Sequence, residues 1–384
     1  MEIYLDNAAT TAVYPEAAAL MNRIMCGDFG NPSSLHKKGI EAEQYLKTAA
    51  KDLAEILKVK DKEIFFTSGG TEADNWAIFG SAMANKRRGM HLITTQIEHA
   101  AAAEPMKKLE KEGFEVTRLG VDETGTIRLD ELKNAIRPDT ILVSIMAVNN
   151  EIGSIQPVKE AGEIIKKANP QTLFHVDAIQ AFCKIPLFPA KEKIDLMAVS
   201  SHKIHGPKGA GFLTIAPGVK IEPLIFGGGQ QGGYRSGTDN VPGAAGMAYA
   251  AKRMAEHLAE NSEKMQSLRK RLIGYLREMP DVAVHGQSLP FGAPHIVNAS
   301  FLGIRSEVLL HSLEEKGIYV SSGSACSSHK RAASATLTAI GCSRAEIESS
   351  VRFSFCEQTT QEEIDQTAEA LNELVPVLRK YSRR

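Results

Sequence analysis

The sequence has 384 residues, of which 43% are hydrophobic and 24% charged, a composition typical of a folded globular protein rather than a disordered one. Its 45 basic and 46 acidic side chains give a formal net charge of -1, so no strong overall field attracts nucleic acid or an anionic membrane. A chain of this length can form a large domain and a smaller one, because single hydrophobic cores rarely grow beyond about 250–300 residues.

The first residues, MEIYLDNAATTAVYPEAA, carry acidic side chains where a secretion signal would need a basic start and an apolar run. No later apolar run approaches the length of a membrane span. The five cysteines are odd in number and widely scattered, which makes a poor framework for disulfides. We therefore expect a cytoplasmic protein with reduced thiols, no membrane contact and no direct binding of nucleic acid.

Between residues 63 and 215, short apolar runs alternate with amphipathic stretches. This rhythm predicts strands alternating with helices, hence an α/β fold with a mainly parallel central sheet. Ligands in such sheets usually bind at the carboxyl ends of the strands, so the residues that follow each strand are the candidates for a site. In chain order the predicted strands are EIFFTS (63–68), HLITTQ (91–96), ILVSIMAV (141–148), LFHVDA (173–178) and LMAVS (196–200).

After Gly243 the pattern is helical through about Leu276, and shorter strands and helices follow. We expect a large domain at 13–257 and a smaller α+β domain made of 1–12 and 258–384. The predicted elements of the smaller domain are the strands 295–301, 317–322 and 351–355 and the helices 306–316 and 362–380.

A first candidate site lies in TSGGTEA, between the strand at 63–68 and the helix that follows it. Glycines such as Gly70 permit close approach of the backbone, and amides at a helix N-terminus bind phosphate. The alternative is an ordinary glycine turn with a threonine cap at Thr71. Neither the P-loop spacing nor a dinucleotide fingerprint is present, so a bound phosphate would belong to another cofactor.

Two further candidates follow the next strands. In HVDAIQA, Asp177 can hold a protonated ring nitrogen and Gln180 can donate to a ring oxygen, although Asp177 could equally cap a helix. In SSHKIHGPKG, Lys203 can lose its proton and condense with a carbonyl, although an isolated lysine is usually solvated. A phosphate cup, a carboxylate and a lysine in this order are what pyridoxal 5'-phosphate requires.

Three histidines accompany these residues. His99, in QIEHAA, could stack on the pyridine ring from the face opposite Lys203, or be a surface histidine that opens a helix. His202 and His205 have the spacing of metal ligands. No carboxylate or thiol lies near them in the sequence, so we expect no resident metal there.

Taken together, these segments resemble the cysteine desulfurases of the NifS/IscS type, in the class V aminotransferase group of pyridoxal-phosphate enzymes. The resemblance implies fold type I, with the parallel sheet in a large domain beside a smaller α+β domain. The matching stretches run nearly end to end: YLDNAATT, GNPSSLH, FTSGGTEADN, IEHAA, VNNEIGSIQP, HVDAIQA, SSHKIHGPKG, GGGQQGGYRSGTDN, SSGSACSS and VRFSF.

The resemblance also implies roles for single residues. Lys203 would bind pyridoxal phosphate covalently, Asp177 would hold the pyridinium nitrogen and Gln180 the ring hydroxyl. Asn150 would lie beside the ring and the substrate, and a homodimer with shared active sites is implied. The residues implied for the phosphate are Gly70, Thr71, Ser200, His202 and, from the partner subunit, Thr238; those implied for the substrate are Arg352, Asn31 and Asn150.

The stretch SSGSACSS (321–328) places Cys326 among small polar residues that give the chain low stiffness. By resemblance, Cys326 is the nucleophile that takes sulfur from L-cysteine as a persulfide and leaves L-alanine, with Lys203 and His99 as the other catalytic residues. It would sit on a mobile loop of the smaller domain, where it could also ligate an iron–sulfur cluster transiently. No chemistry is expected of the other thiols, Cys26, Cys183, Cys342 and Cys356.

Several alternatives stay open at this point. The sulfur acceptor could be an iron–sulfur scaffold protein or a tRNA thiolation system. The same scaffold could serve a selenocysteine lyase or another class V enzyme, and a sulfur-carrying scaffold without enzyme activity is the alternative outside enzymes. Two stretches depart from the family pattern, HKRAASATLTAIGC after the cysteine segment and GGGQQGGYR, and both could alter the docking of partners.

Overall fold

The computed structural model of the chain describes residues 2–322 and 333–382. Within these residues, seven strands form one sheet in the order β2-β8-β7-β6-β5-β3-β4. The strands β3 to β7 run parallel, and β8 is antiparallel to both β2 and β7, which confirms the α/β fold with a mainly parallel sheet. The bounds are Ile64–Thr67 (β2), His91–Thr95 (β3), Glu115–Leu119 (β4), Thr140–Met146 (β5), Leu173–Asp177 (β6), Leu196–Ser200 (β7) and Gly211–Ile215 (β8).

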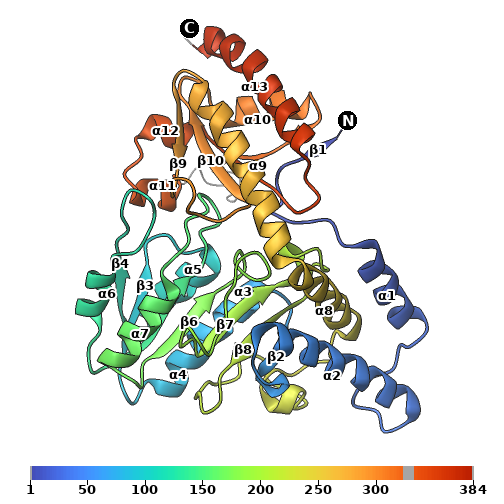
Figure 1. Cartoon of the computed structure of the whole chain (residues 1–384). Helices are drawn as coiled ribbons and strands as arrows, with labels where there is room; N and C mark the ends of the chain where they lie inside the picture. Colours follow the sequence, from blue (N-terminus) through green and yellow to red (C-terminus); the bar gives the residue numbers. More distant parts are fainter. Residues whose placement is uncertain (1, 323–332, 383–384) are drawn as a thin grey trace.

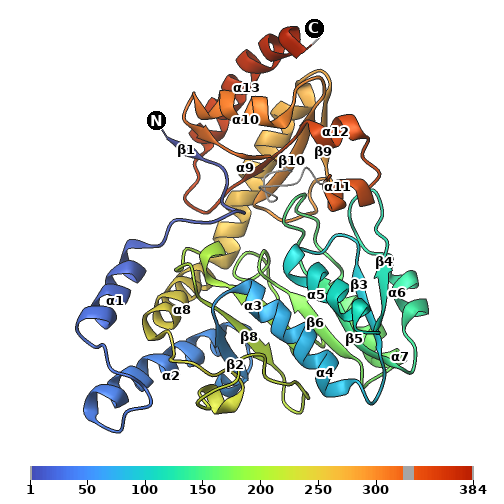
Figure 2. The ribbon, with the colours of Figure 1, turned by 180° about the vertical axis from the view of Figure 1, so that it is seen from behind.

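Helices cover both faces of this sheet (Figures 1 and 2). Successive residues of one strand belong to different cores. Met197 packs in one cluster and Ala198 in another, as expected when both faces of a strand are buried. The helical stretch that follows β2 is interrupted by a π-helical turn at Trp76–Gly80. The helices are Pro15–Cys26 (α1), Lys37–Leu57 (α2), Gly70–Asn75 (α3), Ser81–Asn85 (α4), Ala100–Lys111 (α5), Leu129–Ala135 (α6), Val158–Ala168 (α7) and Val241–Glu256 (α8).

A second, antiparallel sheet with the order β12-β13-β10-β9 lies in the upper part of Figure 1. Its strands are Val282–His285 (β9), Ile296–Phe301 (β10), Ser321–Ser322 (β12) and Ser350–Ser354 (β13), and a parallel pair joins Ile3–Tyr4 (β1) to Ile318–Tyr319 (β11). The helices around it are Leu258–Glu278 (α9), Ser306–Glu314 (α10), Ala335–Ala339 (α11), Arg344–Glu348 (α12) and Gln361–Ser382 (α13). The smaller α+β part is thus present as predicted. Of the described helices, none has the length and apolar character needed to cross a membrane.

The helical run expected from Gly243 to about Leu276 is two helices, because the backbone leaves the helical region at His257, where φ is -114° and ψ is 18°. The smaller part has its own apolar core, in which Leu5 near the N-terminus packs with Leu272, Phe301 and Phe353. The domain boundaries at 13–257 and at 1–12 plus 258–384 stay a prediction.

The N-terminal segment runs from the smaller sheet to the edge of the larger one. The backbone amide of Asn7 donates to the Ser354 carbonyl on β13, and the amide of Thr11 donates to the His202 carbonyl just after β7. Residues 7–11 are therefore bound at one end to the strand that carries Arg352 and at the other to the segment that carries Lys203. This crossing segment supplies backbone carbonyls to the candidate site.

Candidate active site

Lys203 lies at the carboxyl edge of the larger sheet, as the last residue of a 3-10 turn, Ser201–Lys203, that follows β7. Its Nζ donates to the backbone carbonyls of Ala8 and Ala9, each at 2.7 Å. The amine is thus held in a defined position by the crossing segment rather than extended into solvent.

Asp177 and Gln180 lie beside Lys203 because β6 and β7 are parallel neighbours, with Asp177 opposite Ala198. The Asp177 Oδ1 accepts a hydrogen bond from the Ile179 amide at 2.9 Å. The Gln180 Nε2 donates to the Ala8 carbonyl at 2.9 Å, the same acceptor that Lys203 uses. The strand-end residues predicted from the sequence therefore converge on one place.

The charge of Asp177 is controlled by two opposing effects. Its carboxyl is buried, which raises its pKa, while the bond from the Ile179 amide and the charges of His99 and Lys203 lower the pKa. His99 caps the N-terminus of α5, where its Nδ1 accepts from the Ala101 amide at 3.1 Å. Its ring is otherwise exposed, so one face is open for a planar ligand to stack on.

The expected phosphate residues meet where α3 begins. A Cβ on Gly70 would approach the Cδ1 of Ile179 to 2.2 Å and the Cβ of Ser200 to 3.4 Å, so a larger residue here would have to displace the Ile179 side chain. Thr71 follows with an exposed side chain. The His202 Nδ1 lies 3.2 Å from the Thr10 hydroxyl oxygen, and burial, followed by the charges of nearby lysines, lowers the pKa of His202 to about 4. A neutral His202 can donate a hydrogen bond to an anion without placing a second positive charge beside Lys203.

The expected substrate residues Arg352 and Asn150 are in direct contact. The Arg352 Nη1 donates to the Asn150 carbonyl at 2.8 Å, and its Nη2 donates to Asp6 Oδ1 at 2.9 Å. The guanidinium is buried, and its Nε has no hydrogen-bond partner among the described residues. A substrate carboxylate can therefore satisfy a buried donor that the protein leaves unused.

Two expected residues are not joined to this cluster within one chain. Asn31 is exposed between α1 and α2, with its side-chain oxygen accepting from the Ser33 amide at 2.9 Å. Thr238 is exposed in the segment between β8 and α8. That segment is bound to α3 through Arg235, whose Nε lies 2.9 Å from Glu72 Oε1. Cys326, the expected nucleophile, lies outside the described residues.

The sequence interpretation missed a buried polar layer beneath Asp177. His175 on β6 lies with its Nε2 3.4 Å from Asp74 Oδ1 on α3, and its Nδ1 lies 2.9 Å from the Ser144 hydroxyl oxygen. Burial raises the pKa of Asp74, with a further contribution from Asp177, and lowers the pKa of His175 to about 3. Burial thus favours the uncharged form of both groups. The signal that could have found it was His175 within the buried strand LFHVD.

The described cysteines differ in their surroundings. Cys183 is buried in the core of the larger sheet, as predicted, and burial raises its pKa. Cys342 lies 3.5 Å from His285 Nδ1, and burial raises its pKa to about 11, so its thiol is unreactive at neutral pH. Cys356 lies beside Glu357 and His205, a cluster that was also missed, because its members are far apart in the sequence.

Comparison with known proteins agrees with this geometry. Residues 3–367 match the family described as aminotransferase class-V. The chain is 45% identical over 380 residues to the "Cysteine desulfurase IscS" of Methanosarcina thermophila, which covers 99% of this chain and 93% of that protein. The chain belongs to this family, as a cysteine desulfurase of the IscS/NifS type.

Two other proteins support the assignment. The chain is 43% identical over 383 residues to the "Cysteine desulfurase, mitochondrial" of Eremothecium gossypii, covering 99% of this chain and 77% of that protein. A solved structure of a "NIFS-LIKE PROTEIN" has a TM-score of 0.93 and 40% identity, and the match covers 98% of this chain and 100% of that one. The resemblance inferred from the sequence is confirmed, and so is the enzyme class.

The class-V family uses pyridoxal phosphate, and the residues at the sheet edge fit that group. Lys203 supplies an amine, Asp177 a buried carboxylate and Gly70 a backbone that no side chain can obstruct. The exposed ring of His99 leaves a face open for stacking. The roles of single residues remain proposals.

Proposed function

We propose that this desulfurase converts L-cysteine and the thiol of Cys326 into L-alanine and a persulfide on Cys326. The Cβ–S bond of the substrate breaks and an S–S bond to Cys326 forms. The sulfur is thereby oxidised to the sulfane level, while the former Cβ keeps the electron pair, gains a proton and is reduced to a methyl group. The reaction needs no external oxidant or reductant, and all atoms of the two thiols are retained.

When bound, pyridoxal phosphate supplies an electron sink for the pair left at the substrate Cα. Lys203 would hold it covalently before substrate arrives, and the Lys203 amine would remove the Cα proton of the substrate. The carbonyls of Ala8 and Ala9, each 2.7 Å from Nζ, orient that amine. Asp177 keeps a proton on the ring nitrogen, and Gln180 donates to the ring hydroxyl.

Arg352 and Asn150 hold the substrate. The planar guanidinium suits a carboxylate, and its Nε is the buried donor without a partner. His99 stacks on the ring face opposite Lys203. Gly70, Thr71, Ser200 and His202 bind the phosphate, completed by Thr238 from the partner subunit, and Asn31 contributes to the substrate site.

The described residues on either side of residues 323–332 support the role of Cys326. On the N-terminal side, β12 ends at Ser322, the last residue described before residue 333, and Ser321 pairs with Arg352 on β13. On the other side, the Ser334 hydroxyl caps α11 and donates to Glu151 Oε2 at 2.5 Å, next to Asn150. Both ends of the segment thus adjoin the residues proposed for the substrate carboxylate.

The observation that carries the proposal is the convergence at one sheet edge of Lys203, Gln180 and Asp177. Lys203 and Gln180 share the Ala8 carbonyl, and the charge of Lys203 acts on the pKa of Asp177. An amine, an amide and a buried carboxylate at one sheet edge are what covalent catalysis with a pyridine cofactor requires.

We further propose a cytoplasmic homodimer that passes its persulfide sulfur to an acceptor protein, such as an iron–sulfur scaffold, with tRNA thiolation as the other outlet. The near-neutral charge supports a protein acceptor over direct contact with nucleic acid. The cysteines that the structure describes, Cys26, Cys183, Cys342 and Cys356, are free thiols, which fits a reducing compartment.

The function is tested by assaying L-alanine formation from L-cysteine with Cys326→Ala, using Cys342→Ala as the matched thiol control. We expect the visible absorbance of the cofactor to persist in both variants. Desulfuration should fall by at least about 100-fold in Cys326→Ala only, because its nucleophile is gone. Undiminished activity in Cys326→Ala would contradict the mechanism and favour a lyase that releases its product without this thiol. A protein that never takes up the cofactor would favour a scaffold.

A further inference from the structure

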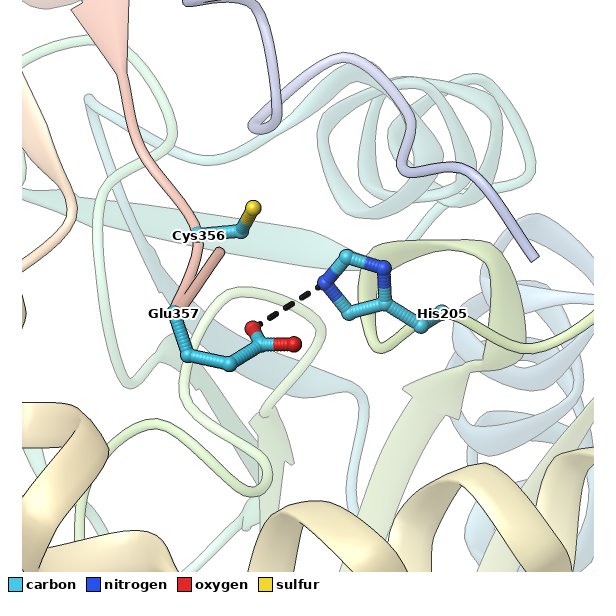
Figure 3. A group of neighbouring side chains, drawn as sticks. All are labelled: His205, Cys356 and Glu357. Atoms are coloured by element: carbon cyan, nitrogen blue, oxygen red, sulfur yellow. Dashed lines mark ion pairs between the residues drawn. The ribbon is translucent and has the colours of Figure 1, made fainter. Parts of the chain in front are cut away.

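The fold brings three possible metal ligands close together outside the proposed active site (Figure 3). His205 lies two residues after Lys203, and Cys356 and Glu357 follow the end of β13. The His205 Nε2 lies 3.2 Å from Glu357 Oε2, and the ligand atoms of all three residues lie within 4.8 Å of one another. Chain segments about 150 residues apart in the sequence thus present an imidazole, a thiol and a carboxylate at one point.

The imidazole is oriented as metal-binding histidines usually are. Its Nδ1 lies 2.8 Å from the Ala12 carbonyl, which can only accept, so Nδ1 carries the proton and Nε2 faces the other two ligands. The ring stacks on Tyr14 at a centroid distance of 4.6 Å, and the His205 amide donates to the Thr11 hydroxyl oxygen at 2.8 Å. The ring is therefore fixed before any ion arrives.

The carboxylate is held in the same manner. The Tyr14 hydroxyl donates to Oε1 of Glu357, which leaves Oε2 directed at His205. Both Oε2 and the His205 Nε2 are buried atoms without a hydrogen-bond partner among the described residues, and the ion pair between them is their contact. His205 and Glu357 thus each have one atom held by a neighbouring group, while their other atoms face each other.

We propose that His205, Cys356 and Glu357 form a binding site for a divalent cation of borderline softness, best matched by Zn²⁺. Imidazole, thiolate and carboxylate are all ligands of zinc, and the two anionic ones neutralise its charge. Zinc bonds of about 2.0–2.3 Å place donor atoms roughly 3.5 Å apart. The His205 and Glu357 atoms, at 3.2 Å, already have this spacing, and a separation of up to 4.8 Å among the three groups needs to close by roughly 1 Å. Water fills the fourth position. Binding of zinc and the ion pair between His205 and Glu357 exclude each other, since both use Nε2 of His205.

The position of this site indicates what the cation would do. It would connect the turn that carries Lys203 to the chain that follows β13, the strand of Arg352. Arg253 lies over the Tyr14 ring at 4.3 Å, and Lys264 donates to the backbone carbonyl of Glu357. These two cations contact groups around the site rather than the three ligand atoms. The cation would therefore hold the two parts of the molecule together, a role separate from the proposed chemistry.

The test is a titration of the pyridoxal-phosphate-loaded Cys326→Ser protein with Zn²⁺, with the free ion followed by a chromogenic chelator. Removing Cys326 prevents capture of zinc by that thiol and makes the result independent of desulfurase activity. We expect one Zn²⁺ per chain. Cys356→Ser, Glu357→Gln and His205→Asn should each weaken binding by at least about tenfold. Asn is chosen because it tolerates the φ of 61° at this position and can still donate to the Ala12 carbonyl.

Cys342→Ser is the matched control, since Cys342 also lies beside a histidine, and its binding should equal that of the parent. Co²⁺ gives a second readout: it should produce visible d–d bands at wavelengths beyond the cofactor absorbance, lost in Cys356→Ser. Failure to bind one Zn²⁺ per chain, or equal binding in the folded Cys356→Ser and Glu357→Gln variants, would overturn the proposal.

Discussion

At the scale of single residues, the site depends on how burial sets the charge of its carboxyl groups. Asp177 is buried, and the charges of His99 and Lys203 oppose the effect of that burial on its pKa. Asp74 lacks such cations and receives the charge of Asp177 instead, which raises its pKa further. Burial thus raises the pKa of both carboxyl groups, and of the two only Asp177 also has neighbouring positive charges that lower its pKa.

Asp177→Asn tests the role of the first carboxylate. Asn can accept the bond from the Ile179 amide but cannot stabilise a proton on the ring nitrogen, so kcat should fall by at least about 100-fold while cofactor stays bound at Lys203. The control is Asp122→Asn, because Asp122 accepts backbone amides only from Thr124 and Thr126 in a turn. Steady-state kinetics with the absorbance spectrum provide the measurement, and a change in KM alone would contradict the assignment.

Glu98 gives a pH-dependent prediction. Burial raises its pKa to about 8 from the ordinary 4.5, and its Oε2 is buried without a hydrogen-bond partner in the described chain. Between these two pKa values, Glu98 keeps its proton in the folded protein but has lost it in the unfolded chain. This group therefore lowers the free energy of unfolding as the pH rises from about 4.5 to 8. In urea unfolding, Glu98→Gln should match the wild type near pH 5 and exceed it near pH 8. A difference that does not vary with pH would refute this.

At the scale of elements, much of the site could be predicted because parallel strands end at the same edge. HVDA and LMAVS were recognised as strands, which placed Asp177 and Lys203 together. The contribution of residues 7–11 could not be predicted, because Ala8 and Ala9 act through backbone carbonyls, which any residue has. The strand β4, Glu115–Leu119, escaped notice because it is a half-exposed edge strand with polar residues.

The segment that carries Thr238 is attached to α3 by the pair of Arg235 and Glu72, which is largely buried. Hydrogen bonds to charged groups contribute about 1.5–3 kcal/mol, so Glu72→Gln should weaken retention of pyridoxal phosphate by about tenfold or more. The effect on kcat at saturating cofactor should be small. Equilibrium dialysis measures this, with Glu16→Gln as control, because its pair with Arg253 is exposed. Equal retention in both variants would show that the pair does not hold the cofactor site.

At the scale of the whole molecule, the proposed site draws on both sheets and, in the proposed homodimer, on residues of a second subunit. The alternation of strands and helices was sufficient to predict the larger sheet, because its strands are buried on both faces and read as apolar runs. The cluster of His205, Cys356 and Glu357 could not be predicted. His205 follows a strand of the larger sheet and the other two residues follow a strand of the smaller sheet, so they come together only in the folded chain. Thr238 and Asn31 are both exposed in the chain, which is consistent with the shared dimeric site proposed for them.

Hybrid dimers test that sharing. A dimer of one Lys203→Ala chain and one Thr238→Val chain should contain one site with both defects and one intact site, so mixing two poorly active variants should restore activity. The assay is run at a pyridoxal phosphate concentration that loads Thr238→Val poorly. Tagged chains allow the hybrid to be purified, with each variant's homodimer as control. A verified hybrid no more active than the mean of its parents would mean that Thr238 does not serve the partner's site.

The central claim is that the sulfur of L-cysteine passes to Cys326, and locating that sulfur tests it most directly. The enzyme is given one equivalent of L-cysteine without reductant or acceptor, alkylated at once, digested and analysed by mass spectrometry. We predict one L-alanine per active site and the added mass of one sulfur atom on the peptide that contains Cys326. L-Alanine formed in full while the extra sulfur is on another cysteine, or on none, would contradict the account.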